Sequence, residues 1–350
     1  MSEQTTTPAP SGAPGPKDPE PKRASTNPVK RFFASPAGRN MGLVVALLLL
    51  VVVGAITGGE NFMSIDNLFV ILRYASVIGV VAIGMTFVIT GGGIDLSVGS
   101  VLGLASVIAS IGAIQTASSG FWPLMVFVSI AVGVIAGLLN GMIIAYGKVV
   151  AFIATLAMLV GARGLAELIS GRSTQVVSNK GFLDFFRSDF LGIDWSVWIF
   201  LIVTVAGWFL LNRTTFGRRT VAVGGNPIAA RLAGVNVKRH TVYLYMIAGA
   251  CAGIAALITL SRTTAGTSTH GMLLELDVIA AVVVGGTLLA GGRGTIGGTV
   301  LGVMLFAVLV NVFTQKNLSS SWQLVAKGVI IVVAVMLQQR FANREAPSTT

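Results

Sequence analysis

Charged residues are scarce in this chain of 350 residues, at 11% of the total, whereas 54% of the residues are apolar. Soluble globular domains carry charge on about a quarter of their residues. Long apolar runs recur here, and each approaches the roughly 20 residues that a helix needs to cross a hydrocarbon core about 30 Å thick. The shortage of charge therefore excludes an ordinary soluble enzyme and indicates a polytopic membrane protein.

Residues that form disulfides or bind metals are also rare. The single cysteine, Cys251, excludes a disulfide framework, and the two histidines, His240 and His270, have no metal-ligand spacing around them. The chain lacks the phosphate-binding pattern Gly-x4-Gly-Lys-Ser/Thr, which Gly141 to Lys148 approach only with the wrong spacing. We therefore expect a non-catalytic chain that binds no metal or cofactor and takes its energy from a gradient or from another protein.

Composition divides the chain into three parts. Residues 1–40, rich in Pro, Ser, Thr and charge, predict a disordered cytoplasmic tail, and residues 341–350 predict a second, short tail. Residues 41–340 predict an all-α membrane domain of about ten transmembrane helices, interrupted by broken or re-entrant Gly-rich segments. The expected spans lie near residues 41–57, 67–89, 98–116, 122–146, 149–169, 196–211, 241–260, 278–290, 295–315 and 322–338.

The formal net charge of +11 raises the question of nucleic acid, but the basic residues gather in a tail and in loops without interleaved aromatic residues. Nucleic acid is therefore not an expected partner. If the N-terminus is cytoplasmic, most Lys and Arg residues fall on the cytoplasmic side, and the outer loops keep only Arg172, Lys180, Arg187, Arg262 and Lys316. The positive-inside rule thus predicts both termini inside, with the lipid bilayer of the plasma (cell inner) membrane around the helices.

The longest cationic stretch between apolar segments is residues 212–240. Within it, Asn226 suits the cap of a helix, Pro227 its first position, and Gly234 the left-handed residue past its end. The short helix from Pro227 to Ala233 places Ile228, Leu232 and Val235 on one face, next to small alanines. Because so short a helix is marginal alone, it needs a surface to rest on, either a partner protein or its own membrane domain and lipid headgroups.

Two glycine strings interrupt the apolar sequence, at residues 90–99 and 285–298. The first contains Asp95, which either caps the next helix through Leu96 and Ser97 or also lines a solute pathway, since an acid in a membrane span is costly. The second matches a dinucleotide fingerprint, Gly292-x-Gly294-x-x-Gly297, in spacing only, because it joins two membrane helices rather than a strand and a helix. Nucleotide binding is not expected there.

Residues 92–103 and 291–302 share six identities in twelve aligned positions. This similarity indicates an internal repeat of the kind from which many transporters are built, or common helix-packing chemistry. The predicted topology puts both copies on the same side of the membrane. A division of ten spans into five and five inverts them, so the two inferences conflict.

Several polar residues fall inside the predicted spans and can hydrogen-bond between helices. Arg163 and Glu167 are four residues apart on one helix, a spacing that favours an ion pair. Of the polar set, the candidates for a solute pathway are Thr86, Asp95, Ser97, Asn140, Thr155, Thr287 and Asn311.

Together, several strings resemble the ribose and xylose class of ABC sugar permeases over residues 65–340. They are residues 90–100, 140–141, 152–156, 161–164, 217–218 with 224–226, 229–236 and 285–302. The chain departs from the usual family pattern at Lys148 to Phe152, which lacks prolines, and at Gly91 to Gly93, where two glycines are usual.

The resemblance implies a homodimeric pore, an ATP-binding cassette subunit at the cytoplasmic face that uses ATP and Mg, and an extracytoplasmic sugar-binding protein. It implies a coupling role for Gly224, Gly225, Asn226, Pro227, Ala229, Ala230, Arg231 and Gly234. The expected function is permeation of a monosaccharide, pentose or hexose. The alternatives are an ion-coupled secondary transporter of a small polar solute that uses Asp95 or Glu167, and a membrane receptor or scaffold whose loop binds a signalling protein.

Overall fold

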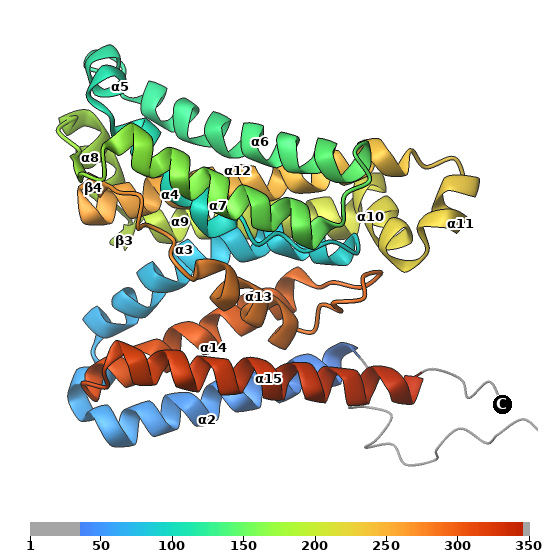
Figure 1. The fold of residues 1–350 in the computed structure, drawn as a ribbon. Coiled ribbons are helices and arrows are strands. Elements are labelled where there is room, and N and C mark those ends of the chain that lie inside the picture. The colour runs from blue at the N-terminus through green and yellow to red at the C-terminus, as the bar shows by residue number, and fades with distance from the viewer. Residues whose placement is uncertain (1–35, 346–350) are drawn as a thin grey trace, which may run out of the picture. The chain divides into compact units, whose positions relative to one another are not determined.

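The computed structural model describes residues 36–345, and these residues are almost entirely helical (Figure 1). The helices are α2 (Pro36–Met63), α3 (Ile65–Thr90), α4 (Val98–Ser110), α5 (Gly112–Ala117), α6 (Pro123–Ala145), α7 (Ala151–Ser170), α8 (Lys180–Arg187), α9 (Trp195–Arg213), α10 (Thr215–Gly225), α11 (Pro227–Leu232), α12 (Val237–Thr263), α13 (Leu274–Val284), α14 (Ile296–Gln315) and α15 (Ser320–Glu345). The chain divides into two compact units, Met1–Arg39 and Asn40–Thr350. Residues 1–35 and 346–350 of the predicted tails lie outside the described residues.

Only four two-residue strands accompany the helices in the described part of the chain. β1 (Gln175–Val176) pairs antiparallel with β4 (Ala265–Gly266), and β2 (Asp189–Phe190) pairs antiparallel with β3 (Ile193–Asp194). These short ladders join connecting segments to one another. The all-α prediction is therefore confirmed.

Seven helices in the described residues are long and apolar enough to cross a membrane: α2, α3, α6, α7, α9, α12 and α14. Helices α4, α13 and α15 lie at the other three predicted spans. Helices α2, α6, α7 and α9 expose many large apolar side chains, among them Ile56, Phe127, Leu168 and Phe209. Exposed apolar surface on this scale is suited to lipid rather than to water, as expected for a polytopic membrane protein.

Helix α3 occupies the centre of the apolar core, and every residue from Ile78 to Thr90 is buried. It packs against α9, α12, α13 and α14. Helices α6 and α12 approach each other backbone to backbone, because a Cβ at Gly133 would overlap the carbonyl oxygen of Gly249, and the reverse also holds. Small residues permit this close packing, on which helix association in a bilayer depends.

Two predicted spans end earlier than the sequence indicated. The span at residues 278–290 was wrong at its end, because α13 stops at Val284 and Gly286 takes a positive φ of 87°. The span at residues 98–116 is divided at Ile111, whose extended backbone separates α4 from α5. The glycine string that begins at Gly285 marks the first break, whereas the apolar run continues through Ile111 and gives no sign of the second.

The two glycine strings end their helices in the same way. After α3, the N–H groups of Gly92 and Gly93 donate to the carbonyls of Ile89 and Val88, both at 2.9 Å. After α13, the N–H groups of Gly286 and Thr287 donate to the carbonyls of Val283 and Val282, at 2.9 and 3.2 Å. A Cβ at Gly291 would also clash with Gly92, so both strings lie at the same end of the bundle. The expectation of a same-side arrangement is correct, and the inverted five-and-five division is wrong for these segments.

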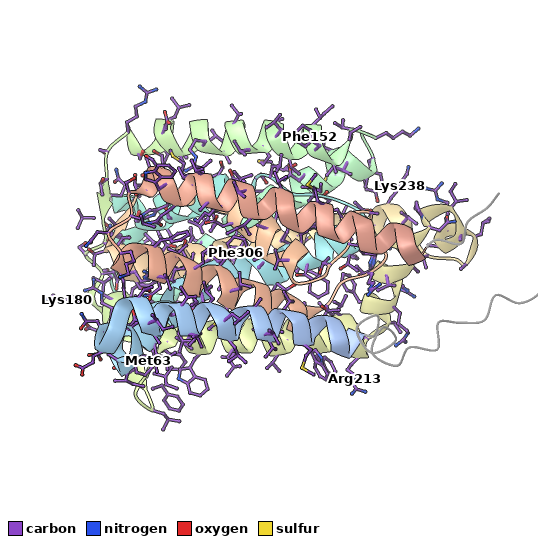
Figure 2. The ribbon with its side chains drawn as sticks, turned by 90° about the horizontal axis from the view of Figure 1, so that it is seen from below. Met63, Phe152, Lys180, Arg213, Lys238 and Phe306 are labelled. Carbon is purple, nitrogen blue, oxygen red and sulfur yellow. The ribbon has the colours of Figure 1, made fainter. Side chains whose placement is uncertain are left out.

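The helix bundle has two chemically different ends. We call the end that carries α10, α11, Arg213 and Lys238 the basic end, and the end that carries α5, α8, Met63 and Lys180 the opposite end (Figures 1 and 2). At the opposite end a cluster of aromatic rings packs around α8, formed by Trp122, Phe182, Phe185, Phe186 and Trp195. Aromatic clusters of this kind are typical of a membrane–water interface.

Candidate functional site

The loop at the basic end folds as the sequence predicts. The side-chain oxygen of Asn226 accepts hydrogen bonds from the N–H groups of Ile228 and Ala229, each at 3.0 Å, which caps α11. Pro227 takes the first helical position, and Gly234 has a φ of 82° just past the end of the helix. The start and the cap of this short helix are therefore confirmed, and the helix ends at Leu232, one residue before the predicted end.

The exposed surface of α11 is more apolar than that of a solvated helix. Ile228 is 70% exposed and Leu232 is 85% exposed, on successive turns of one face, and Arg231 is exposed beside them. Ala230 is only 4% exposed and faces the protein. Ala230 therefore seats α11 on its own chain, whereas Ile228 and Leu232, which share the predicted face, are the groups available to another surface.

The segment before α11 meets both glycine strings. A Cβ at Gly224 would overlap the carbonyl oxygen of Thr90 and crowd the N–H of Gly292. That N–H of Gly292 donates to the Thr90 carbonyl at 2.8 Å. We call this meeting of Thr90, Gly92, Gly224, Gly291 and Gly292 the glycine junction. It places the end of α10 in backbone contact with the break after α3 and the break after α13.

Four of the predicted pathway residues gather around the break between α3 and α4. Oδ1 of Asp95 accepts from the Ser97 N–H at 2.9 Å and from the Ser97 hydroxyl at 2.6 Å. Nδ2 of Asn140 donates to the same hydroxyl at 2.9 Å, while Oδ1 of Asn140 has no hydrogen-bond partner in the described structure. The hydroxyls of Thr155 and Tyr245 both donate to the carbonyl of Ile94, at 3.4 and 3.2 Å. Asp95 thus holds the turn that leads into α4 inside a buried polar cluster. The N-cap of α4 is Ser97 and no side chain caps this helix, so the predicted capping by Asp95 is wrong.

The other three predicted pathway residues lie apart from this cluster. The hydroxyls of Thr86 and Thr299 are 2.8 Å apart and join α3 to α14. Thr287 is buried near Thr90 and Gly294. Asn311 exchanges side-chain hydrogen bonds with Asn67 at 2.7 and 3.2 Å. The structure therefore divides the predicted set among several positions.

The predicted pair of Arg163 and Glu167 is wrong. Glu167 pairs with Arg172 at 3.0 Å, whereas the guanidinium of Arg163 donates to the carbonyls of Ser268 and His270, the latter at 2.8 Å. Both carbonyls belong to residues 264–273, which connect α12 to α13 and which we call the strap. Sequence reasoning had no signal for this tertiary contact.

Glu275 lies outside the predicted spans, and in the structure it is a buried residue of α13, 8% exposed. Its Oε2 atom has no hydrogen-bond partner in the described structure. On the strap nearby, His270 Nδ1 lies 3.2 Å from the Ser106 hydroxyl. Burial, and then the adjacent Arg163, lowers the pKa of His270 to about 4, so its imidazole is neutral at neutral pH.

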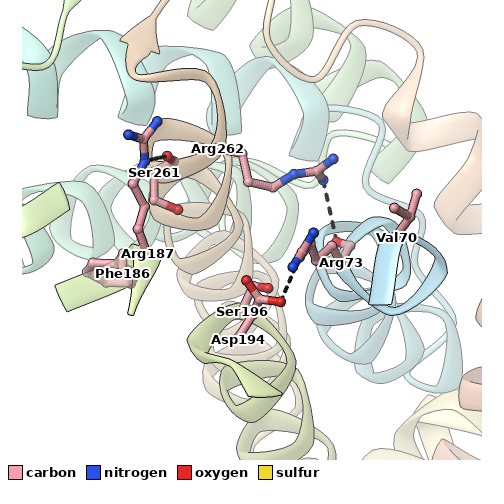
Figure 3. Close-up of a pocket in the computed structure, with 8 residues that line it drawn as sticks. All are labelled: Val70, Arg73, Phe186, Arg187, Asp194, Ser196, Ser261 and Arg262. Atoms are coloured by element: carbon pink, nitrogen blue, oxygen red, sulfur yellow. Dashed lines mark hydrogen bonds and ion pairs between the residues drawn. The ribbon is translucent and has the colours of Figure 1, made fainter. Parts of the chain in front are cut away.

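A cavity of about 310 Å³ opens at the opposite end of the bundle (Figure 3). Arg73, Arg187 and Arg262 line it with the single acid Asp194, which pairs with Arg73 at 2.6 Å. Arg187 also donates to the Ser261 carbonyl at 2.9 Å. Three guanidiniums against one carboxylate leave this cavity with an excess of positive charge.

Among the residues that the structure describes, no group of three or more His, Cys, Asp or Glu residues could hold a metal ion. What the bundle does provide is broken helices, buried polar clusters and an exposed loop helix. A multi-pass, all-α membrane protein with these features belongs to the class of membrane permeases.

The comparisons with known proteins agree with this class. Residues 67–335 match the family model described as "Branched-chain amino acid transport system / permease component". The ribose import permease of Escherichia coli K12 is 38% identical over 316 residues, which cover 89% of this chain and 97% of that protein. That of Bacillus subtilis is 40% identical over 314 residues, 89% and 96% of the two chains. The xylose transport system permease of E. coli K12 is 31% identical over 365 residues, 86% and 92%.

No solved structure matches the chain. The family match extends over most of its length, and the chain therefore belongs to this family of transport permease components. It is a multi-pass protein of the plasma membrane, and the predicted family is confirmed.

Proposed function

We propose that this chain is the membrane permease subunit of an ABC importer that moves a monosaccharide, a pentose or a hexose, into the cell. The relatives reported above are ribose and xylose permeases, which supports this substrate class. In this proposal the chain binds no cofactor, both termini are cytoplasmic, the basic end faces the cytoplasm, and two copies form the pore. ATP and Mg are used by a separate ATP-binding cassette subunit.

The observation that carries the proposal is the structure around α11. Its exposed Ile228 and Leu232 form an apolar contact for the ATPase, and Arg231 lies beside them. Gly224 connects the same loop to both helix breaks through the glycine junction. Closure of the ATPase would therefore push α11 and displace the two breaks, shifting the bundle between its inward-open and outward-open states.

In this proposal the extracytoplasmic binding protein docks at the opposite end of the bundle, beside the arginine-lined cavity. Its excess of arginine favours a partner that presents acidic side chains, because charge complementarity steers docking and suppresses wrong partners. The sugar would be delivered at this end and released at the basic end.

Copurification tests the proposal. Leu232→Asp places a charge in the apolar contact and should reduce recovery of the ATPase with the tagged permease at least tenfold, since hot-spot contacts exceed about 2 kcal/mol. Lys238→Asp, at the same end of the bundle but outside α11, is the matched control and should copurify normally. Normal assembly and normal uptake by the Leu232 variant would contradict the coupling role of α11.

A further inference from the structure

Glu275 and Arg163 lie against the same face of α4, one helical turn apart. A Cβ at Gly99 would overlap Oε2 of Glu275, and a Cβ at Gly103 would lie 2.8 Å from the guanidinium of Arg163. Four residues along a helix rise about 6 Å. The two charges are therefore neighbours, and the structure gives no ion pair between them within its described residues.

The carboxylate of Glu275 and the guanidinium of Arg163 together define what a ligand between them must donate and accept. Oε2 of Glu275 is buried and has no partner, and a buried carboxylate oxygen in that state is strongly unfavourable. A hydroxyl oxygen can accept from the guanidinium of Arg163 and donate to the carboxylate of Glu275, and its two hydrogen bonds of about 2.8 Å, meeting near the tetrahedral angle, join atoms about 4.5 Å apart. The ligand must both donate and accept at one atom, and a neutral polyol does so at each hydroxyl.

The strap closes this position from outside α4. Gly271, with a φ of 69°, packs backbone to backbone on Gly99, and Arg163 holds the carbonyls of Ser268 and His270. The β1–β4 ladder ties the start of the strap to the segment after α7. Because Arg163 is bound both to the strap and to this position, movement of the strap would change access to Glu275.

We infer that Glu275 and Arg163, on α13 and α7, form a binding position for one hydroxyl of the transported solute, covered by the strap. This inference rests on the proposed function and deepens it, because it assigns to the pathway two residues absent from the set predicted by sequence. Glu275 accepts from the hydroxyl, and Arg163 donates to it.

The test uses the complete complex of permease, ATPase and binding protein in proteoliposomes, with radiolabelled D-ribose and its monodeoxy analogues as probes. Glu275→Gln keeps the shape of the side chain and removes its charge. We expect D-ribose uptake to fall about tenfold, as for loss of a charge-assisted hydrogen bond. For one monodeoxy analogue, the ratio of uptake to that of D-ribose should rise toward one. The binding protein is the same in both complexes, so its own preference cancels from that comparison.

Glu167→Gln is the matched control, because Glu167 is a half-exposed carboxylate paired with Arg172, and it should leave uptake and selectivity unchanged. A merely structural Glu275 would give a lower unfolding temperature in Glu275→Gln and equal losses for every sugar, and that result would overturn the inference. We expect instead an unfolding temperature at or above that of the wild type, because an unpartnered buried charge is removed.

The result also separates this inference from the proposed function. Uptake by the wild-type complex with unchanged selectivity in Glu275→Gln contradicts the binding position alone. A wild-type complex that accumulates no sugar contradicts the proposed function, and with it this assignment.

Discussion

Ser97 is the residue on which the buried cluster beside α4 depends. Its hydroxyl donates to Asp95 and accepts from Asn140, and it joins the turn before α4 to α6. Ser97→Ala therefore leaves one buried acceptor and one buried donor without this partner. We expect the free energy of unfolding to fall by about 1–3 kcal/mol.

Thermal unfolding in detergent measures this loss. Ser188→Ala provides the control, because the Ser188 hydroxyl is exposed and bonds only to the carbonyl of Phe185 three residues before it. Equal unfolding temperatures for the two variants would show that the Asp95 turn does not need Ser97.

His270 gives a pH dependence whose sign follows from its lowered pKa. Its pKa is about 4 in the folded protein, from burial and then Arg163, against an ordinary value of 6.5. The unfolded chain therefore takes up this proton first, and folding stability is lost as the pH falls from about 6.5 toward 4. Between pH 7.5 and pH 5 the unfolding temperature of the wild type should fall further than that of His270→Gln. Parallel declines would exclude this residue as a source of acid lability.

Which residues could be predicted from sequence depends on how local their contacts are. The predicted roles of Asn226 and Gly234 were correct, because a helix cap and a left-handed residue are set by near neighbours in the chain. The predicted ion pair of Arg163 was wrong, because its actual partners, Ser268 and His270, are more than a hundred residues away in the chain. Glu275 lies before the expected span at residues 278–290, and its burial depends on packing against α4, which hydropathy does not show.

At the scale of elements, the glycine junction makes a sharp prediction about two adjacent glycines. A Cβ at Gly224 would overlap the Thr90 carbonyl, whereas at Gly225 it would meet only Cα of Gly292, at 3.8 Å. Gly224→Ala should therefore force the backbones apart, as overpacking does at a cost of about 1–3 kcal/mol, and reduce uptake per ATP hydrolysed at least fivefold. Gly225→Ala is the matched control for overpacking, because its added Cβ makes only an ordinary van der Waals contact. It should keep the coupling ratio of the wild type, although the resemblance includes Gly225 in the coupling segment.

Uptake and ATP hydrolysis are measured in the same proteoliposomes, with copurification of the ATPase as the check on assembly. Indistinguishable coupling ratios for the two variants would mean that the junction does not transmit motion. Loss of the ATPase in Gly224→Ala alone would place the effect at docking instead.

Element boundaries show a similar division between local and tertiary information. The apolar runs predicted where helices occur, since each one matched a helix in the structure. They did not predict where α4 stops, because Ile111 is apolar and continues the pattern past the break. The span expected to residue 290 also ran through the start of the glycine string, where α13 in fact ends. The breaks come from backbone conformation at Gly286 and Ile111, and hydropathy does not register it.

At the scale of the whole molecule, the permease reading makes a prediction that separates it from an ion-coupled transporter. The chain reconstituted alone should accumulate no sugar, with or without an imposed proton or sodium gradient, because it lacks a nucleotide-binding motif. Adding the ATPase, the binding protein and ATP should restore uptake even when ionophores collapse all gradients. Gradient-driven accumulation by the chain alone would favour the ion-coupled alternative, in which an intramembrane acid carries the coupling.

The glycine junction has a consequence for how such a pump fails. Three segments from distant parts of the chain touch there through main-chain atoms, so no flexible side chain lies between them to absorb a small displacement. Closure of the ATPase must then move both helix breaks together or move neither of them. We expect an importer with such a junction to let little sugar leak backward when ATP is low.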